Sequence, residues 1–104
     1  MFRTFRSEKY EKKLRKLNNF DKTRVENFEE SLKQEPFTGK QLIYPFFREK
    51  KFNGKRLLYL VFNGHNAVFL VTITNKKLQQ NEIDKIKSNF NIYKEAIIRK
   101  LKEN

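Results

Sequence analysis

The sequence predicts a single α+β domain in which an N-terminal helical hairpin packs on a small antiparallel sheet, followed by a C-terminal helix. Three observations support this class. A chain of 104 residues suits one domain, because domains of about 100 to 150 residues are the commonest size. Apolar residues recur at helical spacing near both ends of the chain, whereas the middle holds β-forming residues broken by two Asn-Gly pairs. We therefore treat residues 1–104 as one domain.

The first third of the chain predicts a short strand and then two helices. Residues 2–6 alternate in polarity, which is compatible with a strand. Ser7 is a favourable N-cap for the first helix, and the Asn18-Asn19 pair ends it. Asp21 is the expected cap of the second helix, which Pro36 prevents from continuing. Each helix has an apolar stripe, formed by Tyr10, Leu14 and Leu17 in the first and by Val25, Phe28 and Leu32 in the second.

The middle of the chain predicts a three-stranded antiparallel meander. Its β-forming residues fill three runs, 42–52, 56–62 and 67–74. Pro45 within the first run indicates a strand edge or a bulge. Asn53-Gly54 and Asn63-Gly64 separate the runs, and both residues of such a pair tolerate the positive φ angles of a type I′ hairpin turn. The helical period then returns from Gln79 to Leu101 and predicts one helix that covers a face of the sheet.

Charge is the strongest compositional signal. Lys and Arg number 24 against 12 Asp and Glu, which gives a formal net charge of +12. A positive field of this size concentrates polyanions near the protein, so it indicates nucleic acid or a ribonucleoprotein as partner. The plainer interpretation is that lysine-rich faces are simply solvated.

Several classes of protein are disfavoured by what the sequence lacks. Without cysteine, neither a disulfide framework nor a thiolate metal site is possible. The longest apolar run, residues 57–62, is far shorter than the roughly 20 residues of a membrane helix. No apolar stretch follows the first charged residues, as a secretory signal would require. We expect a cytoplasmic protein that has no membrane segment and uses no metal or cofactor.

Two segments carry a resemblance to a known family. Residues 50–59 read KKFNGKRLLY, and residues 68–77 read VFLVTITNKK. The first is similar to a pattern of basic residues, a turn glycine, an arginine, two apolar residues and a tyrosine. The second is similar to an apolar strand that ends in a basic pair. Together with the order of the elements, these segments resemble the RelE/ParE superfamily of toxins, and within it the RelE-like branch of mRNA interferases.

The resemblance implies the toxin of a type II toxin-antitoxin system, held by an antitoxin protein, that cleaves messenger RNA on the ribosome without a metal. In that reaction the 2′-hydroxyl of the RNA attacks the adjacent phosphate, which requires a base, an acid and cations around the phosphorane. The catalytic residues that the resemblance implies are Arg56, Lys76 and Lys51. The expected RNA-binding residues are Arg48, Lys50, Lys55 and Lys77.

The sequence departs from the family pattern at two places. No tyrosine occurs in residues 78–83, although some ribonuclease members carry one just after the basic pair. Glu49 stands where a nuclease member has a catalytic lysine. The alternative is therefore a non-catalytic toxin of the same fold, directed at gyrase or inert, or a basic nucleic-acid-binding module.

Individual residues also have plainer interpretations. Arg56 could anchor the sheet edge through a carboxylate, and the lysines around it could form a charged rim that protects strand ends from edge pairing. His65 lies in a turn, where we expect it to be solvated. Tyr59 is expected in the core, because alternate residues of a strand face opposite ways and Arg56 is three positions away. The oligomeric state is not predicted.

Overall fold

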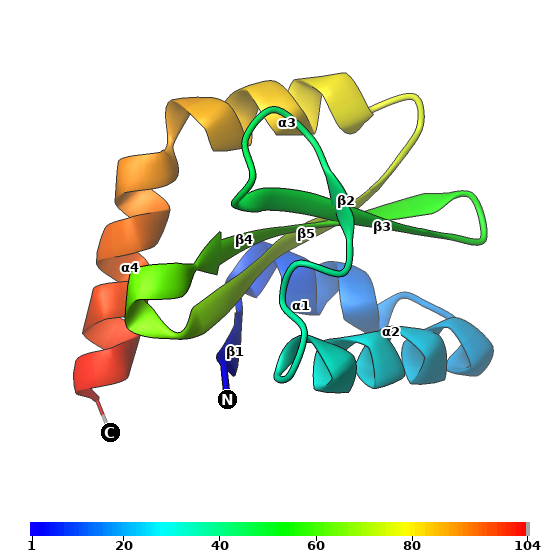
Figure 1. Ribbon diagram of the computed structural model, residues 1–104. Coiled ribbons are helices and arrows are strands. Elements are labelled where there is room, and N and C mark those ends of the chain that lie inside the picture. The colour runs from blue at the N-terminus through cyan, green and yellow to red at the C-terminus, as the bar shows by residue number, and fades with distance from the viewer. Residues whose placement is uncertain (104) are drawn as a thin grey trace.

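The computed structural model describes residues 1–103 as a five-stranded sheet with helices on both faces (Figure 1). In chain order the elements are β1 (Arg3–Arg6), α1 (Glu8–Arg15), α2 (Asn19–Leu32), β2 (Lys40–Gln41), β3 (Phe47–Phe52), β4 (Lys55–Phe62), the 3-10 helix η1 (Asn63–His65), β5 (Ala67–Asn75), α3 (Gln79–Ser88) and α4 (Phe90–Lys102). The α+β class, the helical hairpin, the meander and the N-terminal strand are all confirmed.

The sheet has the strand order β1-β5-β4-β3-β2. Strands β3, β4 and β5 pair antiparallel, as predicted, and the short strand β2, which was not predicted, also pairs antiparallel with β3. Strand β1 instead pairs parallel with β5, with Arg3 opposite Ala67, so the sheet is mixed and not wholly antiparallel. The register between β4 and β5 shifts between Leu58 and Tyr59, as at a β-bulge.

The strand expected over residues 42–52 is shorter than predicted. It begins only at Phe47, and the two residues of β2 lie earlier, at Lys40 and Gln41. Pro45 lies in the turn between the two strands, where its missing N–H removes no bond from the sheet. The backbone N–H of Phe47 donates to the carbonyl of Tyr44 and closes that turn.

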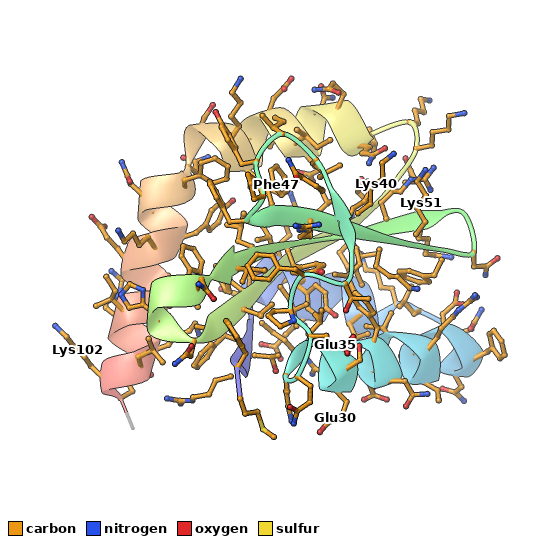
Figure 2. All side chains as sticks on the ribbon, viewed as in Figure 1. Glu30, Glu35, Lys40, Phe47, Lys51 and Lys102 are labelled. Carbon is orange, nitrogen blue, oxygen red and sulfur yellow. The ribbon has the colours of Figure 1, made fainter. Side chains whose placement is uncertain are left out.

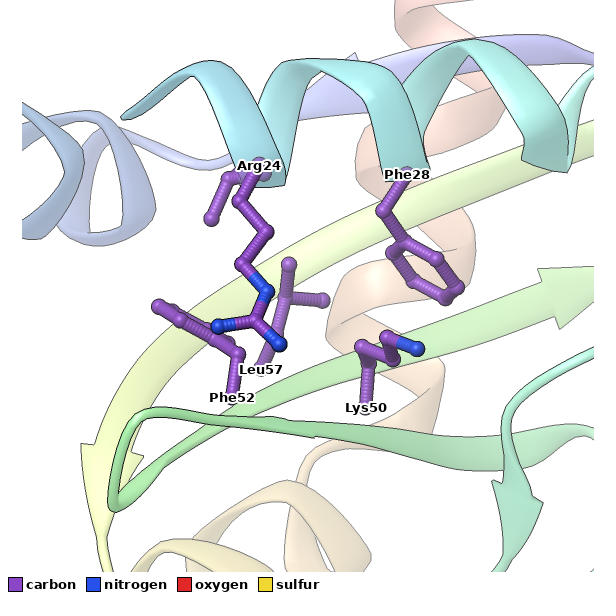
Figure 3. A pocket seen from close by; sticks show the side chains of 6 residues that line it. Arg24, Phe28, Lys50, Phe52 and Leu57 are labelled. Atoms are coloured by element: carbon purple, nitrogen blue, oxygen red, sulfur yellow. The ribbon is translucent and has the colours of Figure 1, made fainter. Parts of the chain in front are cut away.

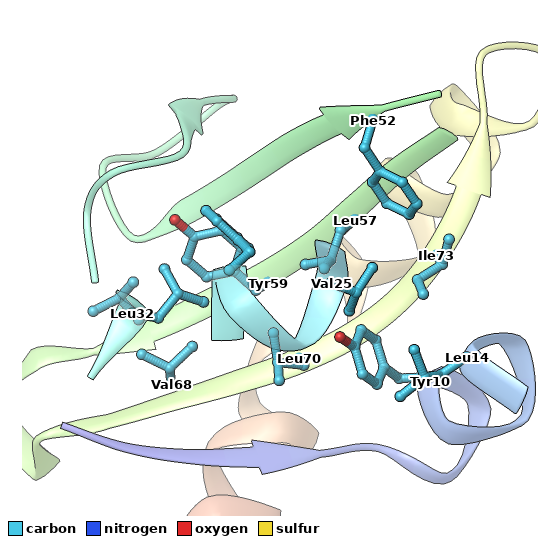
Figure 4. Close-up of a cluster of buried hydrophobic side chains, with 12 residues drawn as sticks. Tyr10, Leu14, Val25, Leu32, Phe52, Leu57, Tyr59, Val68, Leu70 and Ile73 are labelled. Carbon is cyan, nitrogen blue, oxygen red and sulfur yellow. The ribbon is translucent and has the colours of Figure 1, made fainter. Parts of the chain in front are cut away.

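Two apolar clusters lie on opposite faces of the sheet. The helical hairpin of α1 and α2 covers one face, and α3 and α4 cover the other (Figure 1). The hairpin-side cluster consists of Tyr10, Leu14, Val25, Phe28, Leu32, Phe52, Leu57, Tyr59, Val61, Val68, Leu70 and Ile73 (Figure 4). The cluster on the α3 side consists of Phe47, Leu58, Leu60, Ala67, Phe69, Val71, Ile83, Ile86 and Ile97. Because side chains alternate along a strand, a strand residue faces the same side as the cluster residues two positions before and after it.

The helical hairpin is held by polar groups at its ends. Ser7 caps α1, as predicted, because its Oγ accepts from the N–H of Tyr10 at 2.9 Å. The same hydroxyl donates to the carbonyl of Val71 at 2.6 Å and ties α1 to β5. The cap of α2 is Asn18 and not Asp21, since the Oδ1 of Asn18 accepts from the N–H of Asp21 at 2.8 Å. The carboxylate of Asp21 is consequently left to bind other groups.

The two Asn-Gly pairs form different turns. Asn53 and Gly54 have φ angles of 45° and 74°, which confirms a hairpin turn with both residues at positive φ. The second pair lies instead in η1, so a type I′ turn at Asn63-Gly64 was the wrong prediction. Asn66 takes the left-handed conformation there, with φ 49°, and its N–H donates to the carbonyl of Asn63.

The C-terminal helix predicted as one is two helices, α3 and α4, which bend at Asn89. A straight helix from Gln79 to Leu101 would be about 34 Å long. That length is about the longest dimension of the whole molecule, 33 Å. The bend keeps the apolar faces of both helices on the sheet, where Ile86 and Ile97 are buried.

Candidate functional site

The hairpin of β3 and β4 carries opposite charges on its α3-facing side. Lys51 pairs with Arg56 across the two strands, and Arg56 pairs with Thr74 of β5. Directly opposed side chains in a sheet have Cβ atoms about 5 Å apart, so these three residues form a row. Glu49, two residues before Lys51, lies on the same face. This end of the sheet, below α3, is the candidate site.

Arg56 has a buried donor without a partner. Its Nη1 donates to the carbonyl of Lys55 at 3.4 Å, whereas its buried Nε has no hydrogen-bond partner within the described residues. No carboxylate within residues 1–103 is recorded in an ion pair with Arg56, so the structure offers no anchor of that kind. A buried polar group left unpaired costs about 1 to 3 kcal/mol. The guanidinium of Arg56 is therefore held beside Lys51 without a compensating carboxylate within residues 1–103.

Glu49 brings a carboxylate to the same face. Its side chain is only 3% exposed and accepts a hydrogen bond from the Nε2 of Gln79, the first residue of α3. With Lys40 and Lys51 it lines an open pocket of about 290 Å³. Figure 2 shows Lys40 and Lys51 close together below α3. Lys50 also lines this pocket, which therefore combines one fixed carboxylate with three lysines.

Lys76 and Lys77 lie in the exposed turn between β5 and α3. The turn is fixed by Asn75, whose Oδ1 accepts from the N–H of Leu78 at 2.9 Å. Because Thr74 pairs with Arg56, the turn begins at the end of the sheet that carries the candidate site. The structure thus brings Lys76 to the same region as Arg56 and Lys51, and records no side-chain contact among the three within residues 1–103.

The structure separates the residues expected to bind RNA. Arg48 donates to the carbonyls of Pro45, at 2.8 Å, and Gly39, at 3.0 Å. The Nζ of Lys50 lies over the ring of Phe28, 5.3 Å from its centre, on the side of the helical hairpin (Figure 3). Lys55 forms an ion pair at 3.4 Å with the buried carboxylate of Asp21. Alternation along β3 and β4 directs these side chains to the face opposite Lys51 and Arg56, although Lys50 also lines the rim of the pocket with Glu49 and Lys51.

Tyr59 lies in the core, as expected. Its hydroxyl donates to the carbonyl of Pro36 and accepts from the N–H of Gly39, both at 2.9 Å. Burial raises the pKa of Tyr59 to about 12, although the Gly39 N–H and Arg48 act in the opposite direction. A Cβ on Gly39 would lie 2.6 Å from the Tyr59 hydroxyl, so this close approach requires glycine. The contact holds residues 36–39 beside the pocket.

Sequence reasoning missed two residues of the pocket region. Lys40 lies opposite Glu49 because β2 pairs with β3, and no local sequence motif predicts that pairing. Gln79 contacts Glu49 from the start of α3, and its only signal was its place just after the basic pair at Lys76 and Lys77. His65, by contrast, is exposed, as expected.

A helix that crosses a membrane must be both long and apolar. Within residues 1–103, no helix combines the two properties.

Comparisons with known proteins identify the architecture. No family model matches the chain, and no curated protein matches it. Solved structures of small toxins do match. The isolated RelE toxin of Escherichia coli is 18% identical over 83% of this chain and 99% of its own, with a TM-score of 0.64. A chain of the RelBE2 toxin-antitoxin complex of Mycobacterium tuberculosis is 22% identical over 72% of this chain and 98% of its own, with a TM-score of 0.62.

A third match comes from an archaeon. A chain of the RelE-RelB complex of Pyrococcus horikoshii is 17% identical over 72% of this chain and 94% of its own, with a TM-score of 0.65. The layered architecture is therefore that of small bacterial and archaeal toxins. More specifically, the chain has the RelE toxin fold.

Proposed function

We propose that this protein is the toxin of a toxin-antitoxin pair and that it cleaves messenger RNA on the ribosome, in the cytoplasm. The RelE fold supports the class of protein. The observation that supports the cleavage activity is that Arg56, in a row with Lys51 and on the same face as Glu49, forms no ion pair within residues 1–103. Guanidinium is suited to a phosphate, because its donors match two phosphate oxygens at once.

The reaction we propose is attack by the 2′-hydroxyl of the RNA on its neighbouring phosphorus. A P–O2′ bond forms, and the P–O5′ bond breaks. The products are a 2′,3′-cyclic phosphate and a 5′-hydroxyl. Arg56 and Lys76 stabilise the negative charge that develops on the phosphorane oxygens, and no step requires a metal.

Glu49 is the general base in this proposal. Its carboxylate takes the proton of the 2′-hydroxyl, and the ammonium group of Lys51 protonates the leaving O5′. The hydrogen bond from Gln79 fixes the carboxylate on the pocket wall. Lys40 and Lys51 line the same pocket and offset the repulsion between the carboxylate and a phosphate. A base of this kind at Glu49 makes a tyrosine after the basic pair unnecessary.

The activity is tested by mapping RNA 5′ ends in a translation extract. We expect wild-type protein to produce new 5′-hydroxyl ends at codon spacing in a translated reporter, and Glu49→Gln to produce few or none. A messenger that stays intact while translation stops would contradict the cleavage activity and favour a non-catalytic toxin. An extract that continues to translate normally would contradict both.

An antitoxin partner is the second part of the proposal. Two of the three matched structures described above are toxin-antitoxin complexes, RelBE2 of Mycobacterium tuberculosis and RelE-RelB of Pyrococcus horikoshii. The net charge of +12 favours an acidic partner, which can order as it covers a basic surface. We expect a small acidic protein encoded beside this one to co-purify with it when both genes are expressed. Absence of such a neighbour and of any co-purifying peptide would contradict this part.

A further inference from the structure

A second basic site lies on the other side of the same sheet edge. A crevice of about 230 Å³ opens between the end of α1 and the last residues of β5. Lys13, Lys16 and Lys55 line it together with apolar side chains, among them Leu17 and Ile73. We name it the α1–β5 crevice. The cleavage site below α3 does not include these three lysines.

The fold itself creates this crevice. Strand β1 accompanies β5 only as far as Leu70, so the outer edge of β5 has no strand partner from Val71 onward. Helix α1 packs along that edge and is tied to it by the Ser7 hydroxyl. Lys13 and Lys16 are three residues apart at the end of α1, so they lie on one face and line the crevice together.

The charges of the crevice are poorly balanced. Lys55 is paired with the fully buried Asp21. Within residues 1–103 no ion pair is recorded for Lys13 or for Lys16. Cations at a helix C-terminus do interact favourably with the helix dipole, but that effect is only about 0.3 to 1 kcal/mol and does not require them to share a crevice. Ammonium groups brought together in this way repel one another until an anion binds between them.

The position of the crevice points to its ligand. Thr74 lines the crevice and also pairs with Arg56 across the sheet. Lys55, the residue before Arg56, lines it too. Arg56 faces α3 and the crevice faces α1, so the two lie on opposite faces of the same end of the sheet, on strands that are direct neighbours. An RNA strand whose phosphate contacts Arg56 would pass this crevice as it rounds the edge of the sheet.

We propose that the α1–β5 crevice binds a backbone phosphate of the RNA, next to the phosphate held at Arg56. This inference rests on the proposed function. Lysine binds phosphate as a point charge, and contacts to phosphate carry no base information. The crevice therefore contributes affinity and the path of the strand, and base preference arises elsewhere.

The test compares two pairs of substitutions with the same change in charge. The crevice variant is Lys13→Gln with Lys16→Gln, and the control is Lys87→Gln with Lys102→Gln, both exposed on α3 and α4. Binding of a 2′-O-methyl RNA oligonucleotide, which lacks the attacking hydroxyl, is measured at several salt concentrations. We expect the crevice variant to bind about tenfold more weakly, which corresponds to removing one charge-assisted hydrogen bond. Its slope of log affinity against log salt should fall by about 0.7 for each phosphate that the protein no longer neutralises.

Two further measurements separate this inference from the proposed function. In wild-type protein, inorganic phosphate should shift the NMR amide signals of Lys13, Lys16 and Asn75, whether or not the protein cleaves RNA. If cleavage is absent and these shifts occur, the proposed activity fails and the crevice stands as a phosphate site. The variant Lys13→Arg with Lys16→Arg should retain wild-type affinity, because it keeps both charges. Equal affinity and equal salt slope in the crevice and control variants would overturn the inference, as would loss of binding in the arginine variant.

Discussion

Arg56 and Glu49 are opposite charges on one face that are not recorded as paired with each other within residues 1–103. Arg6 and Glu29, an arginine and a buried carboxylate elsewhere in the protein, are bound directly to each other. Arg6 binds Glu29 through two nitrogens, at 2.7 and 3.0 Å, and Tyr10 donates to the same carboxylate at 2.6 Å. Each group in that network has its partner inside the protein. The buried Nε of Arg56 has no such partner within residues 1–103, so Arg56 differs from Arg6 in having its guanidinium uncommitted to a carboxylate.

The first prediction concerns Arg56. We expect Arg56→Ala to lower single-turnover cleavage at saturating ribosomes by at least about a hundredfold, the scale of losing one electrostatic stabiliser of a transition state. Lys102→Ala, at the far end of α4 (Figure 2), should leave the saturated rate unchanged, because it removes the same charge away from the site. Similar rates for the two variants, both folded by circular dichroism, would contradict a catalytic role for Arg56.

A second prediction concerns stability at high pH. The pKa of Tyr59 rises from 10.0 to about 12 on folding, and burial is the main cause. Between these values the unfolded chain loses a proton that the folded protein keeps, so the free energy of unfolding falls as pH rises. The decrease is about 1.4 kcal/mol per pH unit for one tyrosine. Burial also raises the pKa of Tyr10, which adds to the decrease.

Urea unfolding between pH 9 and 11 measures the effect, in the range set by the ordinary tyrosine pKa of about 10. We expect Tyr59→Phe to be less stable than wild type at neutral pH, because the N–H of Gly39 and the carbonyl of Pro36 lose their partner. Its stability should decline less steeply above pH 10, since one tyrosine no longer contributes. An identical slope in the two proteins would show that Tyr59 does not keep its proton in the folded state.

At the scale of elements, a polar link joins α2 to the hairpin that carries the site. The fully buried carboxylate of Asp21 accepts from the Nδ2 of Asn53 at 3.2 and 3.4 Å and from Lys55 at 3.4 Å. Asn53 is the first turn residue, and Lys51 and Arg56 lie on either side of that turn. The position of the site therefore depends on a group outside it. Asp21 has this role because Asn18 has taken over the cap of α2.

The third prediction tests this link by exchanging its partners. Asp21→Asn should lower the free energy of unfolding by about 1.5 to 3 kcal/mol, the range for a hydrogen bond to a charged group. Adding Asn53→Asp restores a carboxylate facing an amide, and aspartate tolerates the positive φ of position 53. We expect the double variant to recover much of the stability in urea unfolding. Additive losses in the double-mutant cycle would contradict a direct link.

At the scale of the whole molecule, the positive charge is spread over both faces of one end of the sheet. Lys40, Lys51 and Arg56 lie toward α3, whereas Lys13, Lys16 and Lys55 lie toward α1. The turn with Lys76 and Lys77 follows β5 at this same end of the sheet. A field of one sign at one end orients a polyanion before contact is made.

The fourth prediction follows from that field. Association of the protein with ribosomes should slow by at least about tenfold between 50 and 200 mM salt, since such steering is screened over a Debye length of about 8 to 10 Å near physiological ionic strength. Stopped-flow measurement of the association rate tests this. A rate that does not change with salt would show that the net charge of +12 does not guide binding.

Much of this fold is predictable from the sequence, because local rules decide it. Ser7, the Asn53-Gly54 turn and the alternation along β4 depend on near neighbours, and each was predicted. The bend at Asn89 and the parallel pairing of β1 depend on the size of the sheet and on distant partners. The candidate site divides in the same way: the resemblance implies Arg56 and Lys51, whose catalytic role stays a prediction, while the contact of Gln79 with Glu49 needed the tertiary structure.

The pairing of β1 with β5 also orders events during synthesis. β1 is synthesised first, but its partner residues begin at Ala67. The pairing of β1 with β5 therefore cannot form until more than sixty further residues have been synthesised. Closing so long a loop is slow and comes late in folding. The same late strand supplies Thr74, beside Arg56, and the turn that carries Lys76. A nascent chain that ends before β5 therefore lacks both its N-terminal strand pairing and a complete candidate site, so the site is assembled only after β5 has been made.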